Sequence, residues 1–221
     1  MKNNPLLALV TNLVLLAGYS TTTEAQRTPK LAAIETDGLV TFYIAKGTEE
    51  SRYKDTDSEL ANWAIKAWEK SLDGKLEFIP GSESTSLLRL YWVPANSGQY
   101  GEMWPLSVNG KRGAGIFIRP NIDELGNELA QRAKNDSLFR DTIVYLTCLH
   151  ELGHALGLSH TDDYADIMYS FEYGGEISSF FERYRNQVNS RQDIRKITGL
   201  SEKDISRAKA LYMATPQINT D

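Results

Sequence analysis

Residues 150–160 have the sequence HELGHALGLSH, which predicts a metal site on the last turns of a helix. On a helix, His150 and His154 stand four positions apart and project from the same face, so their imidazole nitrogens can bind one ion. Gly157 falls where the helix has to end, because glycine takes a left-handed turn at low cost. The chain can then return His160 as a third ligand. Three protein ligands leave one tetrahedral position for water, which is typical of a catalytic zinc site.

Glu151 directly follows the first of these histidines and places a base beside the metal. Its carboxylate can reach a metal-bound water without binding the ion itself, as a general base does in hydrolysis. The chain contains 3 histidines, and all of them lie in this stretch. The added glycine and third histidine at fixed offsets make the pattern more specific than two histidines alone. The alternative interpretation is that these are surface or core histidines on an amphipathic helix.

The composition is that of one globular domain with a sizeable core, since 41% of the 221 residues are hydrophobic and 24% are charged. Lys and Arg total 24 against 29 Asp and Glu, which gives a net charge of -5. The sequence has no basic cluster, so a nucleic-acid partner is not expected. Cys148 is the single cysteine, which excludes an internal disulfide framework, and we interpret it as a small buried hydrophobe.

Residues 1–25 are predicted to be an export signal. Lys2 precedes an apolar run, Leu6–Leu16, that is too short for a permanent membrane span. Small residues before Gln26 suit cleavage at that point, and residues 26–37 would then form a short N-terminal segment. We therefore expect a mature chain that is secreted or resides in the cell envelope, with no stable membrane span. The alternative is an N-terminal helix retained in a cytoplasmic protein.

The spacing of hydrophobic residues and the local composition predict several strands and helices in the remaining chain. The expected strands are residues 39–44, 76–79, 87–93 and 115–119. Residues 95–113 are polar and contain glycine, so we expect a long surface loop there. The expected helices follow a capping box at Thr56 and Glu59, cover residues 121–135, begin at Asp136 or Asp141 before the histidines, and open with a capping box at Ser201 and Asp204.

The residues after the histidine stretch form a short loop that ends in Met168 and Tyr169. Together with that stretch, the loop resembles the metzincin metallopeptidases. The tight spacing from His160 to Met168 is most similar to their matrixin branch, the matrix-metalloprotease-like enzymes, in a bacterial-type secreted single-domain form. The resemblance implies that Met168 forms an apolar floor under the metal. For residues 38–221 it implies an α+β fold with a twisted, mixed five-stranded sheet, an active-site helix, a C-terminal helix, and a zinc cleft between upper and lower lobes.

The resemblance also implies a zinc-dependent endopeptidase that acts on protein or peptide substrates. In such an enzyme one Zn²⁺ is held by His150, His154 and His160, and Glu151 activates the zinc-bound water as the general base. We expect a monomer. Two other classes remain open: a catalytically silent zinc-binding module, and a zinc hydrolase of a non-peptide substrate.

An extended substrate needs a sheet edge and a pocket rim. The strand at residues 115–119 is our candidate for that edge, which makes Gly115, Ile116 and Phe117 candidate substrate-binding residues. An ordinary strand without substrate contact is the alternative. By analogy with the family, the chain after Met168 walls the pocket, so Tyr169 and Tyr173 are candidates for its rim. Tyr164, Tyr169 or Tyr173 could also stabilise an oxyanion, but their spacing does not single one out.

The chain departs from the typical matrixin pattern in several respects. No histidine is left for the second, structural zinc of typical members, no propeptide cysteine is present to hold the enzyme latent, and Ser170 stands where proline is common. Matrixins generally bind calcium, but Asp162, Asp163 and Asp166 lack a regular calcium-loop spacing. Residues 177–188 carry an apolar stripe at helical spacing, which we expect to pack mainly against the lower lobe.

Overall fold

One mixed sheet lies at the centre of the fold in a computed structural model that describes residues 31–96 and 99–213. Its strands are β1 (Leu39–Ile44), β2 (Glu77–Pro80), β3 (Leu88–Trp92), β4 (Gly101–Val108) and β5 (Lys111–Ile118). They run in the order β2-β1-β3-β5-β4, all parallel except β4, which pairs antiparallel with β5 at one edge. The predicted export signal lies outside the described residues.

The parallel strands alternate between buried and partly exposed side chains. Val40 and Phe42 of β1 and Leu88 and Leu90 of β3 are buried, while the residues between them are not. A sheet with one covered face requires this period of two. The strands predicted at residues 39–44, 76–79 and 87–93 are confirmed to within one or two residues.

β4 shows that the prediction of a loop over residues 95–113 was wrong. Asn109 and Gly110 follow the strand with φ angles of 52° and 78°, which match a two-residue hairpin turn of type I′, and β5 begins immediately afterwards. Pro105 is tolerated within β4 because the strand lies at the edge of the sheet. Glycine, proline and polar residues weakened the strand signal in this stretch.

The assignment of residues 115–119 to the sheet edge was also wrong. β5 lies between β3 and β4, and its main-chain groups pair with a strand on each side. Gly115, Ile116 and Phe117 are therefore committed to the interior of the sheet. The edge strand next to β5 in the described sheet is β4.

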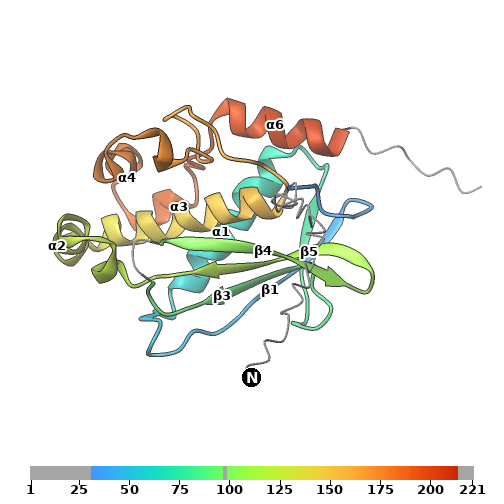
Figure 1. Cartoon of the computed structure of the whole chain (residues 1–221), viewed down its shortest axis with the longest axis horizontal. Coiled ribbons are helices and arrows are strands. Elements are labelled where there is room, and N and C mark those ends of the chain that lie inside the picture. Colours follow the sequence, from blue (N-terminus) through green and yellow to red (C-terminus); the bar gives the residue numbers. More distant parts are fainter. Residues whose placement is uncertain (1–30, 97–98, 214–221) are drawn as a thin grey trace, which may run out of the picture. The chain divides into compact units, whose positions relative to one another are not determined.

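Helices cover one face of the sheet, with α1 and α3 packed against each other (Figure 1). The helical segments of the described residues are, in chain order, α1 (Asp57–Ser71), η1 (Ile122–Leu125), α2 (Asn127–Asn135), α3 (Ser137–Ala155), η2 (Phe171–Tyr173), α4 (Ile177–Arg185), α5 (Arg191–Ile194) and α6 (Glu202–Met213). Within the described ranges, none of these helices has the length and apolar character that a bilayer crossing requires.

Two contacts fix α1 against α3. The indole Nε1 of Trp68 donates a hydrogen bond to Leu149 O at 3.0 Å. Arg140 on α3 forms an ion pair with Asp57 on α1, and both side chains are buried. A buried charge is costly without such a partner, so each side chain of this pair compensates the burial of the other.

The start of α1 differs from the prediction. Thr56 is the N-cap residue, but its side chain makes no capping hydrogen bond. The Glu59 carboxylate pairs with Arg191 instead of reaching back to the N-cap. A tertiary ion pair thus replaces the predicted capping box.

The start of α6 agrees with the prediction. Ser201 Oγ accepts a hydrogen bond from the Asp204 N–H at 2.9 Å, and Asp204 Oδ2 accepts one from the Ser201 N–H at 3.0 Å. Asp204 also accepts hydrogen bonds from the N–H groups of Ile167 (2.7 Å) and Met168 (3.4 Å). One buried carboxylate therefore joins the start of α6 to the loop that ends at the methionine.

Other predicted features are confirmed with small changes. Gly126, at φ 108°, divides the helix expected over residues 121–135 into η1 and α2. Asp136 caps α3 by accepting a hydrogen bond from the Phe139 N–H at 3.0 Å, so the first of the two proposed starts is correct. The apolar stripe of residues 177–188 forms α4 and packs inward, and Cys148 is buried.

Candidate metal centre

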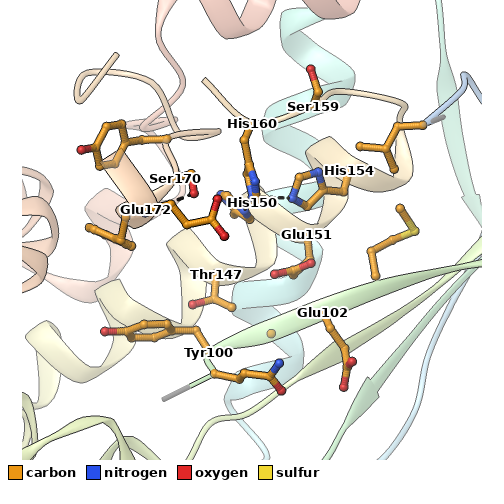
Figure 2. A pocket seen from close by; sticks show the side chains of 16 residues that line it. Tyr100, Glu102, Thr147, His150, Glu151, His154, Ser159, His160, Ser170 and Glu172 are labelled. Carbon is orange, nitrogen blue, oxygen red and sulfur yellow. Dashed lines mark hydrogen bonds between the residues drawn. The ribbon is translucent and has the colours of Figure 1, made fainter. Parts of the chain in front are cut away.

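Three imidazoles converge at the C-terminal end of α3 (Figure 2). His150 and His154 come from the last two turns of the helix, as their spacing requires. Gly157 has a φ angle of 103°, and a Cβ at this position would lie 2.8 Å from the Ala32 carbonyl carbon. Both the backbone angle and the neighbouring chain therefore require glycine. The turn at Gly157 brings His160 back toward the two helical histidines.

The spacing of the ring nitrogens suits a tetrahedral ion. His160 Nε2 lies 3.2 Å from His150 Nε2 and 3.0 Å from His154 Nε2. Two nitrogens that each bind zinc at about 2.0–2.1 Å in a tetrahedral site lie about 3.3 Å apart. His160 thus stands from each helical histidine at close to the separation that a shared zinc ion imposes.

The tautomers of the helical histidines also fit a metal. His150 Nδ1 donates to Ile167 O at 2.7 Å, and His154 Nδ1 donates to Leu158 O at 2.8 Å. Carbonyl oxygens only accept, so the protons sit on Nδ1 and the Nε2 lone pairs face the site.

The pKa values of the three histidines also favour metal binding. Burial lowers the pKa of His150 to about 3 and that of His154 to about 4, so both rings are neutral near pH 7. Burial also lowers the pKa of His160, and the Glu172 carboxylate opposes this effect. Neutral imidazoles are the form that binds metal. Electron-rich nitrogens at these distances favour a cation between them, so the residues fit Zn²⁺.

Met168 lies beside the helix that carries the histidines. Its side chain is fully buried and packs against Gly153, where a Cβ would lie 2.3 Å from the Met168 sulfur. The Thr161 N–H donates to Met168 O at 2.9 Å, and the Ser170 N–H donates to Thr161 O at 3.1 Å, which closes the loop on itself. This position suits the apolar floor that the family resemblance implies for Met168.

Glu151 is buried between the histidines and β4. Burial raises its pKa to about 8; the Glu102 carboxylate adds to the rise and Arg119 opposes it. β4 approaches the side chain at Gly101, where a Cβ would lie 2.8 Å from Glu151 Cγ and 2.9 Å from Thr147 Cγ2. The absence of a side chain at Gly101 therefore allows the strand to press directly against the candidate base.

An ion pair between Glu102 and Arg119 stands beside the site and was missed in the sequence. Arg119 is only 6% exposed, and Glu102 also accepts a hydrogen bond from Trp104 Nε1 at 2.9 Å. The Asn-Gly turn carried a signal for this pair. A two-residue hairpin at that turn sets Glu102 opposite Phe117, and hence near Arg119.

A cleft of about 840 Å³ runs over the histidines. Gly101–Met103 of β4 line it on one side and residues 169–172 line it on the other, with Glu151 between them. Such a cleft, with a metal at its base and a strand edge along it, can accept an extended chain.

The structure separates the predicted substrate residues. Tyr169 lines the cleft, and its hydroxyl donates to Gly174 O at 2.7 Å. Tyr173 is 63% exposed and lies outside the described lining, as do the three residues predicted from β5. The Tyr164 hydroxyl donates to Glu176 O. The hydroxyls of Tyr164 and Tyr169 are thus engaged by backbone carbonyls, which weakens their candidacy as oxyanion donors.

A lysine of α6 lies beside the acidic loop that was considered for calcium. Lys203 Nζ lies 3.5 Å from Asp163 Oδ2 and 3.7 Å from Asp166 Oδ2. Ser201 Oγ donates to the other oxygen of Asp166 at 2.6 Å. A lysine ammonium between two carboxylates disfavours a second cation there, so the loop adds no support for calcium.

The family model of matrixin (Peptidase_M10) matches residues 35–213. The chain belongs to the matrixin family. The mixed sheet with its helices is the α+β fold of the matrixin catalytic domain, as the resemblance implied. No curated protein shows a significant match to the chain.

Membership of this family supports a general assignment. Matrixins are zinc metalloendopeptidases and are generally extracellular. The assignment therefore supports a hydrolase that cleaves proteins and binds a catalytic zinc ion. The histidines of this matrixin supply a cluster that could hold it.

Proposed function

We propose that this matrixin is a zinc-dependent endopeptidase, with His150, His154 and His160 as the zinc ligands and Glu151 as the general base. The main support is the convergence of three Nε2 atoms while backbone carbonyls hold Nδ1 of the two helical rings. Zinc bound there would act as a Lewis acid and would lower the pKa of a coordinated water toward neutrality.

The protein residues supply the proton transfers. Glu151 accepts a proton from the attacking water and passes it to the departing amine. A carboxyl with a raised pKa can release a proton as well as bind one near neutral pH, and burial moves Glu151 in that direction. Gly101 and Thr147 touch the Glu151 side chain and restrict its orientation.

The substrate would bind along β4. As the edge strand of the described sheet, β4 has one row of main-chain groups directed away from β5, and Gly101–Met103 border the cleft. An extended peptide can add to such an edge by main-chain hydrogen bonds, so that its scissile bond lies over the histidines. In this proposal β4 takes the place of the β5 residues that the sequence suggested for substrate binding.

The test uses the chain from Gln26 onward, loaded with zinc and supplied with a peptide library. We expect one zinc per chain and cleavage that a chelator abolishes. Glu151→Gln should keep the zinc and lose cleavage, whereas Glu128→Gln, on an exposed position of α2, should retain both. Zinc binding without turnover would refute the proposal in favour of a silent module. Turnover confined to non-peptide esters would refute it in favour of another zinc hydrolase.

We also propose that residues 1–25 direct export and that the monomeric mature chain begins near Gln26. The apolar run Leu6–Leu16 and the generally extracellular location of matrixins support this. Mass spectrometry of the N-terminus in cell fractions would decide it. An intact N-terminus confined to the cytosol would contradict the export proposal, and a larger particle in light scattering would contradict the monomer.

A further inference from the structure

The candidate cleft carries an unbalanced charge. Among its described lining residues there is no lysine or arginine, whereas three are glutamates: Glu102, Glu151 and Glu172. They stand on different elements, β4, α3 and η2, so the carboxylates border the cleft on several sides. Each carboxylate is paired with a cation of the protein, takes part in the reaction, or remains available to a bound substrate.

Two of the three have a role already. Glu151 is the buried base of the proposed function. Glu102 is paired with the guanidinium of Arg119 and accepts a further hydrogen bond from Trp104 Nε1. Its charge is largely neutralised within the protein, so it offers little attraction to a substrate cation.

Glu172 is the exception. Its side chain is exposed, and within the described ranges it forms no ion pair and no hydrogen bond. Figure 2 shows its carboxylate directed toward the histidines, from the side of the cleft opposite β4. A cationic side chain beside the cleaved bond would therefore meet a carboxylate that is not paired with any side chain of the described residues.

The backbone at Glu172 is fixed by its neighbours. The Glu172 N–H donates to Ser170 Oγ at 3.3 Å, and the Gly174 N–H donates to Phe171 O at 3.0 Å. The ring of Phe171 packs edge-to-face on that of Phe180, with centroids 5.3 Å apart. Anchoring Phe171 in the aromatic cluster keeps the next residue on the cleft side, so little ordering is needed when a substrate binds.

We propose that Glu172 gives the enzyme a preference for peptides with an arginine or lysine directly beside the cleaved bond, a specificity that rests on the proposed endopeptidase function. The guanidinium or ammonium group pairs with the exposed carboxylate across the cleft. Because the pair stays partly hydrated, its effect is moderate, and we expect about a threefold to fivefold gain in kcat/KM. Added salt should reduce this gain, because ions screen exposed charges.

The experiment compares two fluorogenic peptides that differ only in arginine or citrulline at one position. Citrulline has nearly the same shape and lacks the charge. One pair places the exchange directly before the cleaved bond, and a second pair places it directly after. We expect the arginine peptide to be favoured at one of these positions by the zinc-loaded enzyme. The ratio should fall to near one in Glu172→Gln and below one in Glu172→Lys.

Glu176→Gln is the matched control, because Glu176 is exposed, lies four residues away and does not line the cleft. This variant should keep the wild-type ratio. Cleavage with the same arginine-to-citrulline ratio in wild type and Glu172→Gln would overturn this inference and leave the endopeptidase intact. Failure of the wild-type enzyme to cleave any peptide would overturn the proposed function and the inference with it.

Discussion

Gly101→Ala should impair cleavage in a protein that still folds. A Cβ at this position would lie 2.8 Å from Glu151 Cγ, where ordinary contact begins at 3.4 Å, so the side chain must retreat by roughly 0.6 Å. A displacement of about 1 Å in a reacting group can reduce the rate about 100-fold. We therefore expect kcat to fall about 10-fold to 100-fold. Overpacking should lower the free energy of unfolding by about 1–3 kcal/mol.

The assay measures kcat on a fluorogenic peptide, zinc content, and the midpoint of urea unfolding. Gly110→Ala is the control, because Gly110 lies in the same hairpin at φ 78° and its Cβ would meet nothing within 4 Å. Strain at that φ angle should cost about 1 kcal/mol of stability while leaving kcat unchanged. A Gly101→Ala enzyme that keeps its zinc and at least a third of the wild-type kcat would refute the idea that β4 positions the base.

Three further outcomes are expected. Arg140→Met should lower the free energy of unfolding by about 3–5 kcal/mol, because it leaves the buried Asp57 carboxylate unpaired. Urea unfolding tests this. A double variant that also carries Asp57→Leu should recover most of the loss. In the metal-free protein, the histidines have folded pKa values below their ordinary 6.5, so the unfolded chain takes up more protons and stability falls as pH drops from 7 to 5, by about 1–2 kcal/mol for each of His150 and His154. The raised pKa of Glu151 has the opposite effect on stability: it stabilises the fold at low pH, and this contribution is lost as pH rises toward 8. The measurement should therefore use Glu151→Gln, which removes this contribution. Stability at pH 5 that equals or exceeds stability at pH 7 would contradict the prediction for the histidines. Removal of metal by a chelator should lower the thermal midpoint as well as stop cleavage, and added zinc should restore both, as differential scanning fluorimetry can show.

The candidate metal centre could be predicted from the sequence more completely than any other part of the fold. His150, His154 and Gly157 obey local rules, helical spacing and a left-handed stop, which hold whatever packs around them. The same is true of the capping box at Ser201, where donor and acceptor lie within one turn. Local rules failed at Thr56, because the partner of Glu59 is a residue far along the chain.

The sheet edge could not be assigned because it depends on strand order, which no short pattern encodes. Because β4 was predicted to be a loop, the neighbouring strand β5 was assigned to the edge. Gly101 was then missed too, since its importance lies in a contact with Glu151 across 50 positions of sequence. The Asn109-Gly110 turn was the available correction, because that pair strongly favours a two-residue hairpin.

The Asp204 carboxylate joins the loop that ends at Met168 to a helix that is synthesised after it. A nascent polypeptide that has not yet emerged beyond residue 200 lacks the group that receives the N–H of Ile167 and Met168. The loop beneath the three histidines then lacks this acceptor, although residues 150–160 have already been synthesised. A chain truncated before α6 should therefore hold the loop that ends at Met168 less firmly.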